Sequence, residues 1–319
     1  MDPLDLAVYR FLAPGGVARF WAGRRVIDPR ITSREIAAHV GASESGVRRR
    51  LQRLADRGYL QDRTVLPNPS LFGQQVFVVD LLVREPREVD QILRDLSLID
   101  GVVFTRDILD ESQRKVRVHF VTEDEAGAQR RAKLIGRLAA STGPVQPRAY
   151  YIPACESNLS PIEWRVLLFL RHNADATLAD LGDAARISLR SAARCYHHLI
   201  DSHAAWWTHG PESEEFPLAL VQADLTSEAH REPVAEWIRT TEANWIPVAR
   251  DGLGLSPGRA HSETAGLVPA DAPAALERFV RRLANLDGVD SVRRTFALGS
   301  SIYPRWFTDR IAARVVAGR

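Results

Sequence analysis

The sequence repeats itself, and this repeat is the strongest constraint on its fold. Thr32 with Glu35 has the spacing of a helix capping box, and Thr177 with Asp180 has the same spacing further along the chain. Three apolar residues at i, i+4 and i+7 follow each box at the same offset: Val47, Leu51 and Leu54 in the first copy, and Ala192, Tyr196 and Leu199 in the second. We therefore expect two related halves.

The segment from Thr32 to Tyr59 predicts a helix-turn-helix. Two helical stretches are separated at Gly41, and the second ends at Gly58, a residue type that easily adopts the left-handed conformation. A β-like run from Tyr59 to Leu66 follows and is interpreted as a wing. The second copy predicts three helices, at Ser160–His172, Leu178–Ala185 and Leu189–Ser202.

Each helix-turn-helix is followed by a block with the order βαββαβ. The elements expected in the first block are Gln75–Val83, Pro86–Leu98, Val102–Leu109, Arg114–Thr122, Glu125–Ala140 and Val145–Ile152. Those expected in the second block are Leu218–Leu225, Glu228–Thr240, Ala274–Asn285 and Val289–Leu298, with a long glycine-broken loop in the middle. This ferredoxin-like pattern places two helices on one face of an antiparallel sheet and leaves the other face for a partner.

The expected fold class is α+β, with two copies of a winged helix-turn-helix and a ferredoxin-like domain. A chain of 319 residues has room for two to four such units. The predicted domains are a winged helix-turn-helix at 1–66, a ferredoxin-like domain at 75–153, a degenerate winged helix-turn-helix at 157–213, and a second ferredoxin-like domain at 217–304.

The composition is that of an ordered protein, with 45% apolar and 26% charged residues. The sequence has neither a membrane-length apolar run nor a signal-peptide pattern at its start, so a cytoplasmic protein is expected. The two cysteines, Cys155 and Cys195, are too far apart in sequence for a C-x-x-C motif. Cys195 and the nearby His197, His198, His203 and His209 fit no zinc-site spacing, so we expect neither a metal nor a cofactor.

Charge is distributed unevenly between the two helix-turn-helix copies. Residues 1–63 contain twelve arginines and seven acids, whereas residues 156–216 contain five arginines and nine acids. In the first copy, Arg48, Arg49, Arg50, Arg53 and Arg57 are accompanied only by Asp56. A solvated helix face is the usual meaning of such charges, but their place in the second helix of a helix-turn-helix favours binding in a DNA major groove.

The predicted DNA contacts divide into two groups. Ser45, Arg49 and Arg48 lie towards the start of the recognition helix and are expected to approach base edges. Gln52 lies on the same face and is also predicted to contact DNA. Arg53, Thr32, Ser33 and the wing residue Arg63 are expected to contact phosphates and to fix the register.

The helix-turn-helix sequence ITSREIAAHVGASESGVRRRLQRLADRGYL, together with LDGVDSVRRTFAL at Leu286–Leu298, resembles the Lrp/AsnC family of transcription regulators. The resemblance covers nearly the whole chain, twice. It implies a winged helix that binds double-stranded DNA and ferredoxin-like domains that pair sheet to sheet and bind a small-molecule effector, an amino acid or another metabolite.

Two features depart from the family pattern. The central hairpin of the first half reads TRDILDESQRK (Thr105–Lys115) and lacks the family's Gly-x-x-Asp-like turn, which puts an amino-acid ligand in question. An insert at residues 14–30 also separates the first two helices of the first winged helix. It adds Arg24, Arg25 and Arg30 beside Phe20 and Trp21, and the sequence assigns it no role.

The second winged helix presents Arg190, Arg194, His197 and His198 on the comparable face, within a region of net negative charge that repels DNA. We therefore expect that only one helix-turn-helix of each chain, the first, binds DNA strongly. Two chains would have to pair to read a two-fold related operator, so a homodimer or larger homo-oligomer is predicted.

Two other functional classes remain open beside the regulator. Siroheme decarboxylases are also built from two Lrp-like halves, but they carry a histidine-rich motif on the central hairpin, where this chain has only His119. A sensor that has the fold without binding DNA is the third class. The arginine-rich helix favours the regulator, so we do not expect an enzyme.

Overall fold

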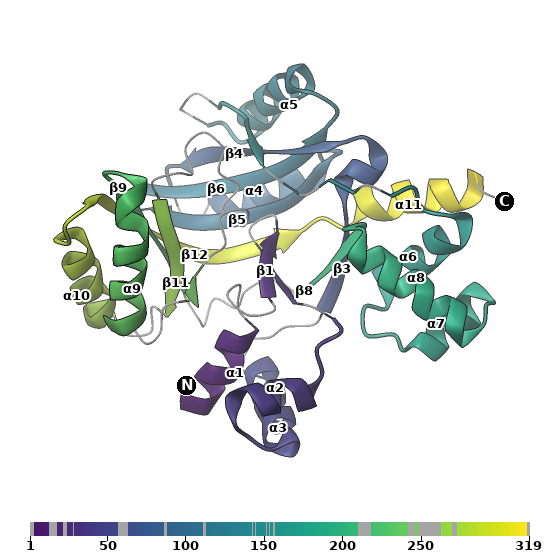
Figure 1. Cartoon of the computed structure of the whole chain (residues 1–319). Coiled ribbons are helices and arrows are strands. Elements are labelled where there is room, and N and C mark those ends of the chain that lie inside the picture. The colour runs from purple at the N-terminus through teal and green to yellow at the C-terminus, as the bar shows by residue number, and fades with distance from the viewer. Residues whose placement is uncertain are drawn as a thin grey trace.

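The computed structural model describes residues 3–12, 18–21, 24–27, 29–56, 63–85, 88–110, 113–141, 143, 145–150, 152, 154–155, 157–209, 218–241, 246–247, 263–269 and 273–317. The predicted α+β class is confirmed. Within these ranges, no helix has both the length and the apolar character needed to cross a membrane. In Figure 1 the first three-helix unit lies at the bottom and the second at the right, beside an extended sheet with its own helices.

The first unit contains three helices: α1 (Pro3–Phe11), α2 (Ser33–Val40) and α3 (Glu44–Asp56). The predicted capping box is present, because the Thr32 hydroxyl accepts a hydrogen bond from the Glu35 amide and the Glu35 carboxylate accepts one from the Thr32 amide. Gly41 ends α2 with a φ of 68°, in the left-handed region. The core of the unit consists of Val8, Tyr9, Leu12, Ile36, Ala37, Val47 and Leu54.

The insert between α1 and α2 contributes a β-hairpin. Its strands β1 (Ala18–Trp21) and β2 (Arg24–Ile27) pair antiparallel. Strand β3 (Arg63–Pro67) lies in the predicted wing, whose expected start at Tyr59 falls outside the described residues. The insert is thus a structural extension of the winged helix.

The second unit repeats the first with α6 (Pro161–His172), α7 (Leu178–Ala185), α8 (Leu189–Asp201) and strand β8 (Ala205–His209). Capping boxes start α6, at Ser160, and α7, at the predicted Thr177. The core includes the predicted Ala192 and Leu199, both fully buried, and Trp207 from β8.

The wings of the two units form one sheet. Its strand order is β1-β2-β8-β3, so β8 of the second unit lies between strands of the first. In the β3–β8 ladder, Val65 is opposite Trp207, and Arg171 of α6 donates a 2.9 Å hydrogen bond to the Thr64 hydroxyl. The hairpin pairs with the other edge of β8, where Val26 is opposite Thr208. The insert therefore links the first unit to the second.

The first βαββαβ block has the predicted element order: β4 (Gln75–Val83), α4 (Glu88–Ser97), β5 (Val102–Asp110), β6 (Gln113–Thr122), α5 (Glu125–Leu138) and β7 (Arg148–Tyr150). A short 3-10 helix, η1 (Pro69–Phe72), connects it to the wing. The strand order is β5-β6-β4-β7. Residues such as Phe77, Phe120 and Ile135 form a core between the sheet and α4 and α5.

The second block contains β9 (Leu218–Leu225), η2 (Glu228–His230), α9 (Arg231–Thr241), β10 (Ile246–Pro247), β11 (Glu263–Pro269), α10 (Pro273–Ala284) and β12 (Val289–Ile302). The long loop predicted between its middle strands lies largely at residues 248–262, outside the described residues. Val221, Ile238 and Leu283 are in the core beneath α9 and α10.

The two blocks join edge to edge through β12, which is longer than predicted. Its first part pairs with β9, and its second part pairs with β5, where Thr295 is opposite Asp110 and Ile302 is opposite Phe104. The result is one eight-stranded sheet of order β10-β11-β9-β12-β5-β6-β4-β7. The internal pairing of the halves therefore uses strand edges, in contrast to the sheet-to-sheet pairing that the family resemblance implies.

The sheet face opposite α4 and α5 was expected to be left for a partner, and the chain itself covers part of it. Val76, Val78, Phe104 and Val121 make this face apolar, so exposure to water would be unfavourable. Leu66 and Trp206 of the wing strands and Trp306 and Phe307 of α11 (Arg305–Ala317) pack on it. Helix α11 was not predicted, and its Ile311 and Val315 also enter the core of the second unit.

Candidate functional site

The exposed side of α3 contains most of the predicted base-reading residues. Its opposite side buries Gly46, Val47 and Leu54, so Ser45, Arg48, Arg49 and Gln52 point to solvent. Arg48 pairs with Glu44 one turn earlier, and Gln52 donates a 2.8 Å hydrogen bond to Asp56. Arg49 is exposed and makes no hydrogen bond or ion pair with another described residue.

Arg53, predicted to contact phosphate, is held by the first helix of its own unit. Asp5 of α1 is only 1% exposed, and its Oδ1 lies 3.3 Å from Nη2 of Arg53 and 3.5 Å from Nε of Arg50. These contacts draw both guanidinium groups towards α1. Of the four arginines described in α3, Arg48 and Arg49 are therefore the most exposed.

The remaining predicted phosphate contacts also have partners or are partly buried. The Thr32 hydroxyl is occupied by Glu35 in the capping box, and Ser33 is the half-buried first residue of α2. Arg63 forms a 2.7 Å ion pair with Asp175, in the loop between α6 and α7. This pair connects the wing strand to the second unit.

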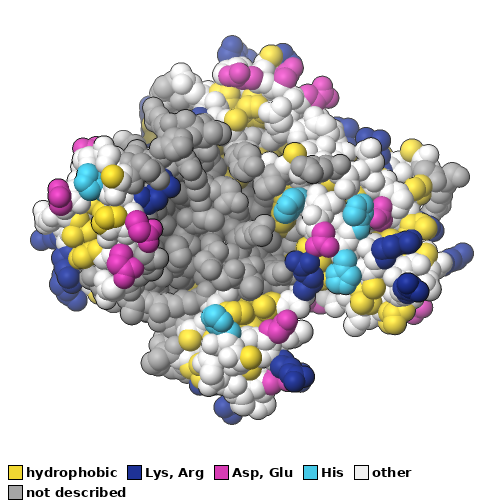
Figure 2. All heavy atoms as spheres, viewed as in Figure 1, with side chains coloured by type: hydrophobic (Ala, Val, Ile, Leu, Met, Phe, Trp, Pro, Cys, Tyr) yellow, Lys and Arg dark blue, Asp and Glu magenta, His cyan; other side chains and the backbone are white. Residues whose placement is uncertain are grey.

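The comparable side of α8 carries Arg190, Arg194 and His197, all exposed. His198 lies on another side, where it contacts Glu163 and Ser157. Figure 2 shows Lys and Arg side chains over the lower unit, where α2 and α3 lie. Acidic and histidine side chains are interspersed with the basic ones there, as they are over the second unit at the right.

A second polar region lies on the partly covered face of the eight-stranded sheet. Asp80 of β4 accepts hydrogen bonds from Nε of Arg117 at 2.6 Å and from Nη2 of Arg148 at 2.9 Å. Burial alone would raise the pKa of Asp80, but the hydrogen bond from Arg117 and the charges of Arg117, Arg148 and Lys115 lower it below its usual value. Asp80 is therefore a carboxylate amid a cluster of cations.

His119 lies on the same face and is 2% exposed. Its ring centroid is 5.0 Å from those of Phe104 and Tyr150, and its Nδ1 has no hydrogen-bond partner among the described residues. Burial and the nearby charges of Arg117 and Arg106 lower the pKa of His119 to about 3. The imidazole is therefore neutral at neutral pH. The sequence around His119 did not indicate that this residue would be buried between aromatic rings.

The Cys/His region near α8 does not assemble a metal site. Within the described ranges, no three histidine, cysteine or acidic residues are grouped so that they could hold a metal ion. Cys155 and Cys195 are both unpaired thiols, and burial raises the pKa of Cys195.

A family model described as winged helix-turn-helix DNA-binding matches residues 28–61, which include α2 and α3. Among solved structures, the siroheme decarboxylase NirDL is similar at 10% identity and a TM-score of 0.51, covering 97% of this chain and 99% of its own. NirDL in co-complex with an iron-uroporphyrin III analogue gives 12% identity and a TM-score of 0.50, over 87% and 92% of the two chains.

The leucine response regulatory protein LrpA of Mycobacterium tuberculosis is 22% identical over 50% of this chain and 98% of its own, with a TM-score of 0.31. No curated protein matches the chain. The chain therefore contains a winged helix-turn-helix, and its whole-length fold is similar to that of NirDL.

Proposed function

We propose that the chain is a sequence-specific transcription regulator of the Lrp/AsnC type that binds double-stranded DNA through α3. The observation that carries the proposal is Arg49, an exposed arginine with no described partner on the outward side of α3. The winged helix-turn-helix model matches this part of the chain. In a helix-turn-helix, the second helix enters the major groove with its N-terminal half towards the bases.

Arg49 is expected to make the principal base contact, because the arginine fork suits the O6 and N7 acceptors of guanine. Ser45 and Arg48 lie beside it on the same half of the helix. Arg53 and Arg63 can bind phosphate only by weakening their ion pairs with Asp5 and Asp175. We therefore expect their contributions to be smaller than that of Arg49.

The proposal includes a homodimer and a small-molecule effector. Residues 156–216 have an excess of acids, so the second winged helix is expected to bind DNA weakly and two chains to pair on a two-fold related operator. The effector, an amino acid or another metabolite, is assigned to the sheet blocks.

The test is fluorescence-anisotropy titration of the full chain with DNA from upstream of its own gene, across a salt series. Arg49→Ala is expected to lose about tenfold or more in affinity and to give a shallower salt slope. The matched control is Arg190→Ala on the comparable side of α8, which is expected to change little. Equal losses for both variants would contradict the hypothesis that only the first helix-turn-helix binds DNA. Wild-type binding no tighter than that of Arg49→Ala would contradict the proposal that the chain is a transcription regulator.

A second candidate is a tetrapyrrole-binding enzyme of the siroheme decarboxylase kind. It is supported by the buried His119, whose Nδ1 has no partner among the described residues and which has Arg117 and Arg106 near it. Arg148 and Lys115 add positive charge around Asp80 on the same sheet face, and such a group of cations suits a ligand with several carboxylates. Titration of the full chain with iron-uroporphyrin should then shift the porphyrin absorption band, and His119→Ala should reduce the shift. An unshifted spectrum at saturating protein would remove this candidate.

A further inference from the structure

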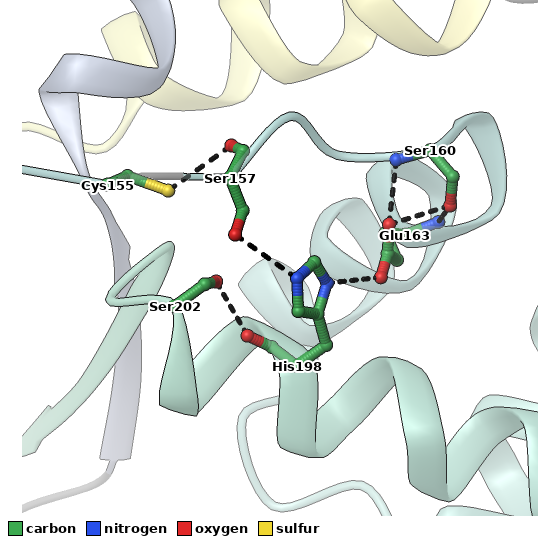
Figure 3. A network of polar contacts seen from close by, with 6 residues as sticks. All are labelled: Cys155, Ser157, Ser160, Glu163, His198 and Ser202. Atoms are coloured by element: carbon green, nitrogen blue, oxygen red, sulfur yellow. Dashed lines mark hydrogen bonds and ion pairs between the residues drawn. The ribbon is translucent and has the colours of Figure 1, made fainter.

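Ser157, His198 and Glu163 form a chain of hydrogen bonds across the second three-helix unit (Figure 3). Ser157 lies in the segment that leads into α6, Glu163 lies in the first turn of α6, and His198 lies in α8. Nδ1 of His198 contacts Oε1 of Glu163, and Nε2 of the same ring is 3.3 Å from the Ser157 hydroxyl. Each ring nitrogen therefore has its own partner.

Glu163 is held in place by a second set of contacts. Its Oε2 accepts hydrogen bonds from the amide and the hydroxyl of Ser160, both at 2.7 Å, while its Oε1 contacts His198. Burial alone would raise the pKa of Glu163, but the hydrogen bonds from Ser160 and His198 lower it below its usual value. Glu163 is therefore an ionised and oriented carboxylate at neutral pH.

This carboxylate fixes the tautomer of the histidine. An ionised carboxylate only accepts hydrogen bonds, so Nδ1 of His198 must carry the proton that points at Glu163. In the neutral ring, Nε2 then has a lone pair facing the Ser157 hydroxyl, which donates to it. This is the arrangement that activates a serine nucleophile: a base within reach of the hydroxyl and a third group that orients the base.

A purely structural role, in which Glu163 and His198 hold α6 and α8 together, explains their contact but does not explain why His198 also reaches Ser157. The first unit has the equivalent contact between α1 and α3, an ion pair of Asp5 with Arg53. In the second unit, a histidine replaces the arginine, and its outer nitrogen reaches a hydroxyl from another segment. The side chain of His198 is 38% exposed and Ser157 is half-buried, so a small reagent can reach both.

We propose that Ser157 is an activated nucleophile that accepts an acyl group from an activated ester or thioester, with His198 as the general base and Glu163 as its positioning residue. Oγ of Ser157 forms a bond to the carbonyl carbon while its proton passes to Nε2 of His198. The bond between that carbon and the leaving oxygen or sulfur then breaks, and the leaving group takes the proton from His198. The products are an acyl-serine and a free alcohol or thiol.

We confine the activity to this acylation step. Acylation and the hydrolysis that would follow it both pass through a tetrahedral oxyanion, and the proposal covers only the first of these two steps. Labelling of the serine is therefore the appropriate readout.

The experiment treats the full chain with an alkyl fluorophosphonate, which mimics an activated acyl donor, and locates the label by peptide mass spectrometry. Wild type should be labelled at Ser157, and Ser157→Ala should lose the label. His198→Gln should slow labelling about 100-fold or more, the usual contribution of a general base. Ser202→Ala is the matched control, because the Ser202 hydroxyl donates to the backbone carbonyl of His198, not to its ring, and its loss should leave the rate unchanged.

Glu163→Gln keeps the result interpretable if His198→Gln disturbs the fold, because glutamine can still accept the capping bonds from Ser160. It should fold as wild type by circular dichroism and label at least about tenfold more slowly, through loss of the oriented tautomer. The proposal is overturned if wild type labels no faster than His198→Gln, if Ser157→Ala retains the label, or if a folded Glu163→Gln labels at the wild-type rate.

Discussion

Arg53 in α3 and His198 in α8 occupy the same position of the repeat, and each contacts the acidic third residue of the first helix in its own unit. Those acids are Asp5 in α1 and Glu163 in α6. The same contact between helices therefore uses the guanidinium of an arginine in one unit and the imidazole of a histidine in the other. This difference also leaves the second unit with less positive charge for DNA.

Asp5→Asn is expected to destabilise the first unit. The variant leaves Arg50 and Arg53, which are 17% and 35% exposed, without the buried charge that neutralises them. Loss of one partner of a fully buried pair costs about 3–5 kcal/mol, and solvent screening of the arginines reduces the expected loss to about 1–3 kcal/mol. Urea unfolding of the full chain measures it.

The matched control is Glu44→Gln, which removes the exposed ion pair with Arg48 on the same helix. A surface pair contributes about 0–1 kcal/mol, so this variant should unfold almost as wild type does. Equal destabilisation by the two substitutions would argue against a special role for Asp5.

Asp80→Asn is expected to lose stability at neutral pH and to match wild type in acid. The folded-state pKa of Asp80 lies below its unfolded value, so its contribution is fully present above about pH 4 and is lost as the pH falls through the folded pKa. At pH 7 the free energy of unfolding should drop by about 1–2 kcal/mol, given the partly exposed arginines around it. Unfolding at pH 7, 4 and 2.5 tests this, with the exposed Asp309→Asn as control. A difference that does not change with pH would contradict it.

The helices of both three-helix units could be predicted because their signals are local. The T-x-x-E box at Thr32 and the T-x-x-D box at Thr177 begin helices at the expected residues, and Gly41 ends one as expected. Several strands of the sheet, such as Gln75–Val83 and Leu218–Leu225, also have the predicted bounds. The repeat and its element order were therefore readable from the sequence.

What could not be predicted depends on contacts between distant segments. The pairing of β3 with β8 joins residues that are far apart in the chain, and no local pattern specifies it. The same holds for the ion pair of Asp5 with Arg53. Because of this pair, Arg53 is less available to DNA than its position on the helix suggests. In the sequence, His198 could be seen only as one of several nearby histidines. Its partners Glu163 and Ser157 are distant in the chain and approach it only in the folded unit.

Phe307→Ala is expected to loosen both the sheet face and the second three-helix unit. Phe307 is 1% exposed and belongs to the sheet-face core, while Ile311 and Val315 of the same helix belong to the core of the second unit. Truncating a buried phenylalanine costs about 3–5 kcal/mol, including the cavity that remains. Hydrogen exchange should show faster opening in β5 and α6 together, whereas Val316→Ala, at an exposed position, should change neither.

His119→Leu is expected to remove a pH dependence of stability. Burial lowers the pKa of His119 to about 3 in the folded chain, whereas an unfolded histidine titrates near 6.5. Below about pH 6.5 the unfolded state therefore binds a proton that the folded state does not, and wild-type stability falls by up to about 1.4 kcal/mol per pH unit from this residue. The leucine variant lacks that term, so its stability relative to wild type should rise as the pH falls from 7 to 4.

The control is His197→Leu, which removes an exposed histidine of α8 outside the sheet face. Urea unfolding at pH 7, 6, 5 and 4 measures both differences. If His119→Leu and wild type lose stability in parallel across this range, His119 is accessible to protons in the folded chain. Such a result would mean that the sheet face around Phe104 and Tyr150 is open to water, as a ligand site there requires.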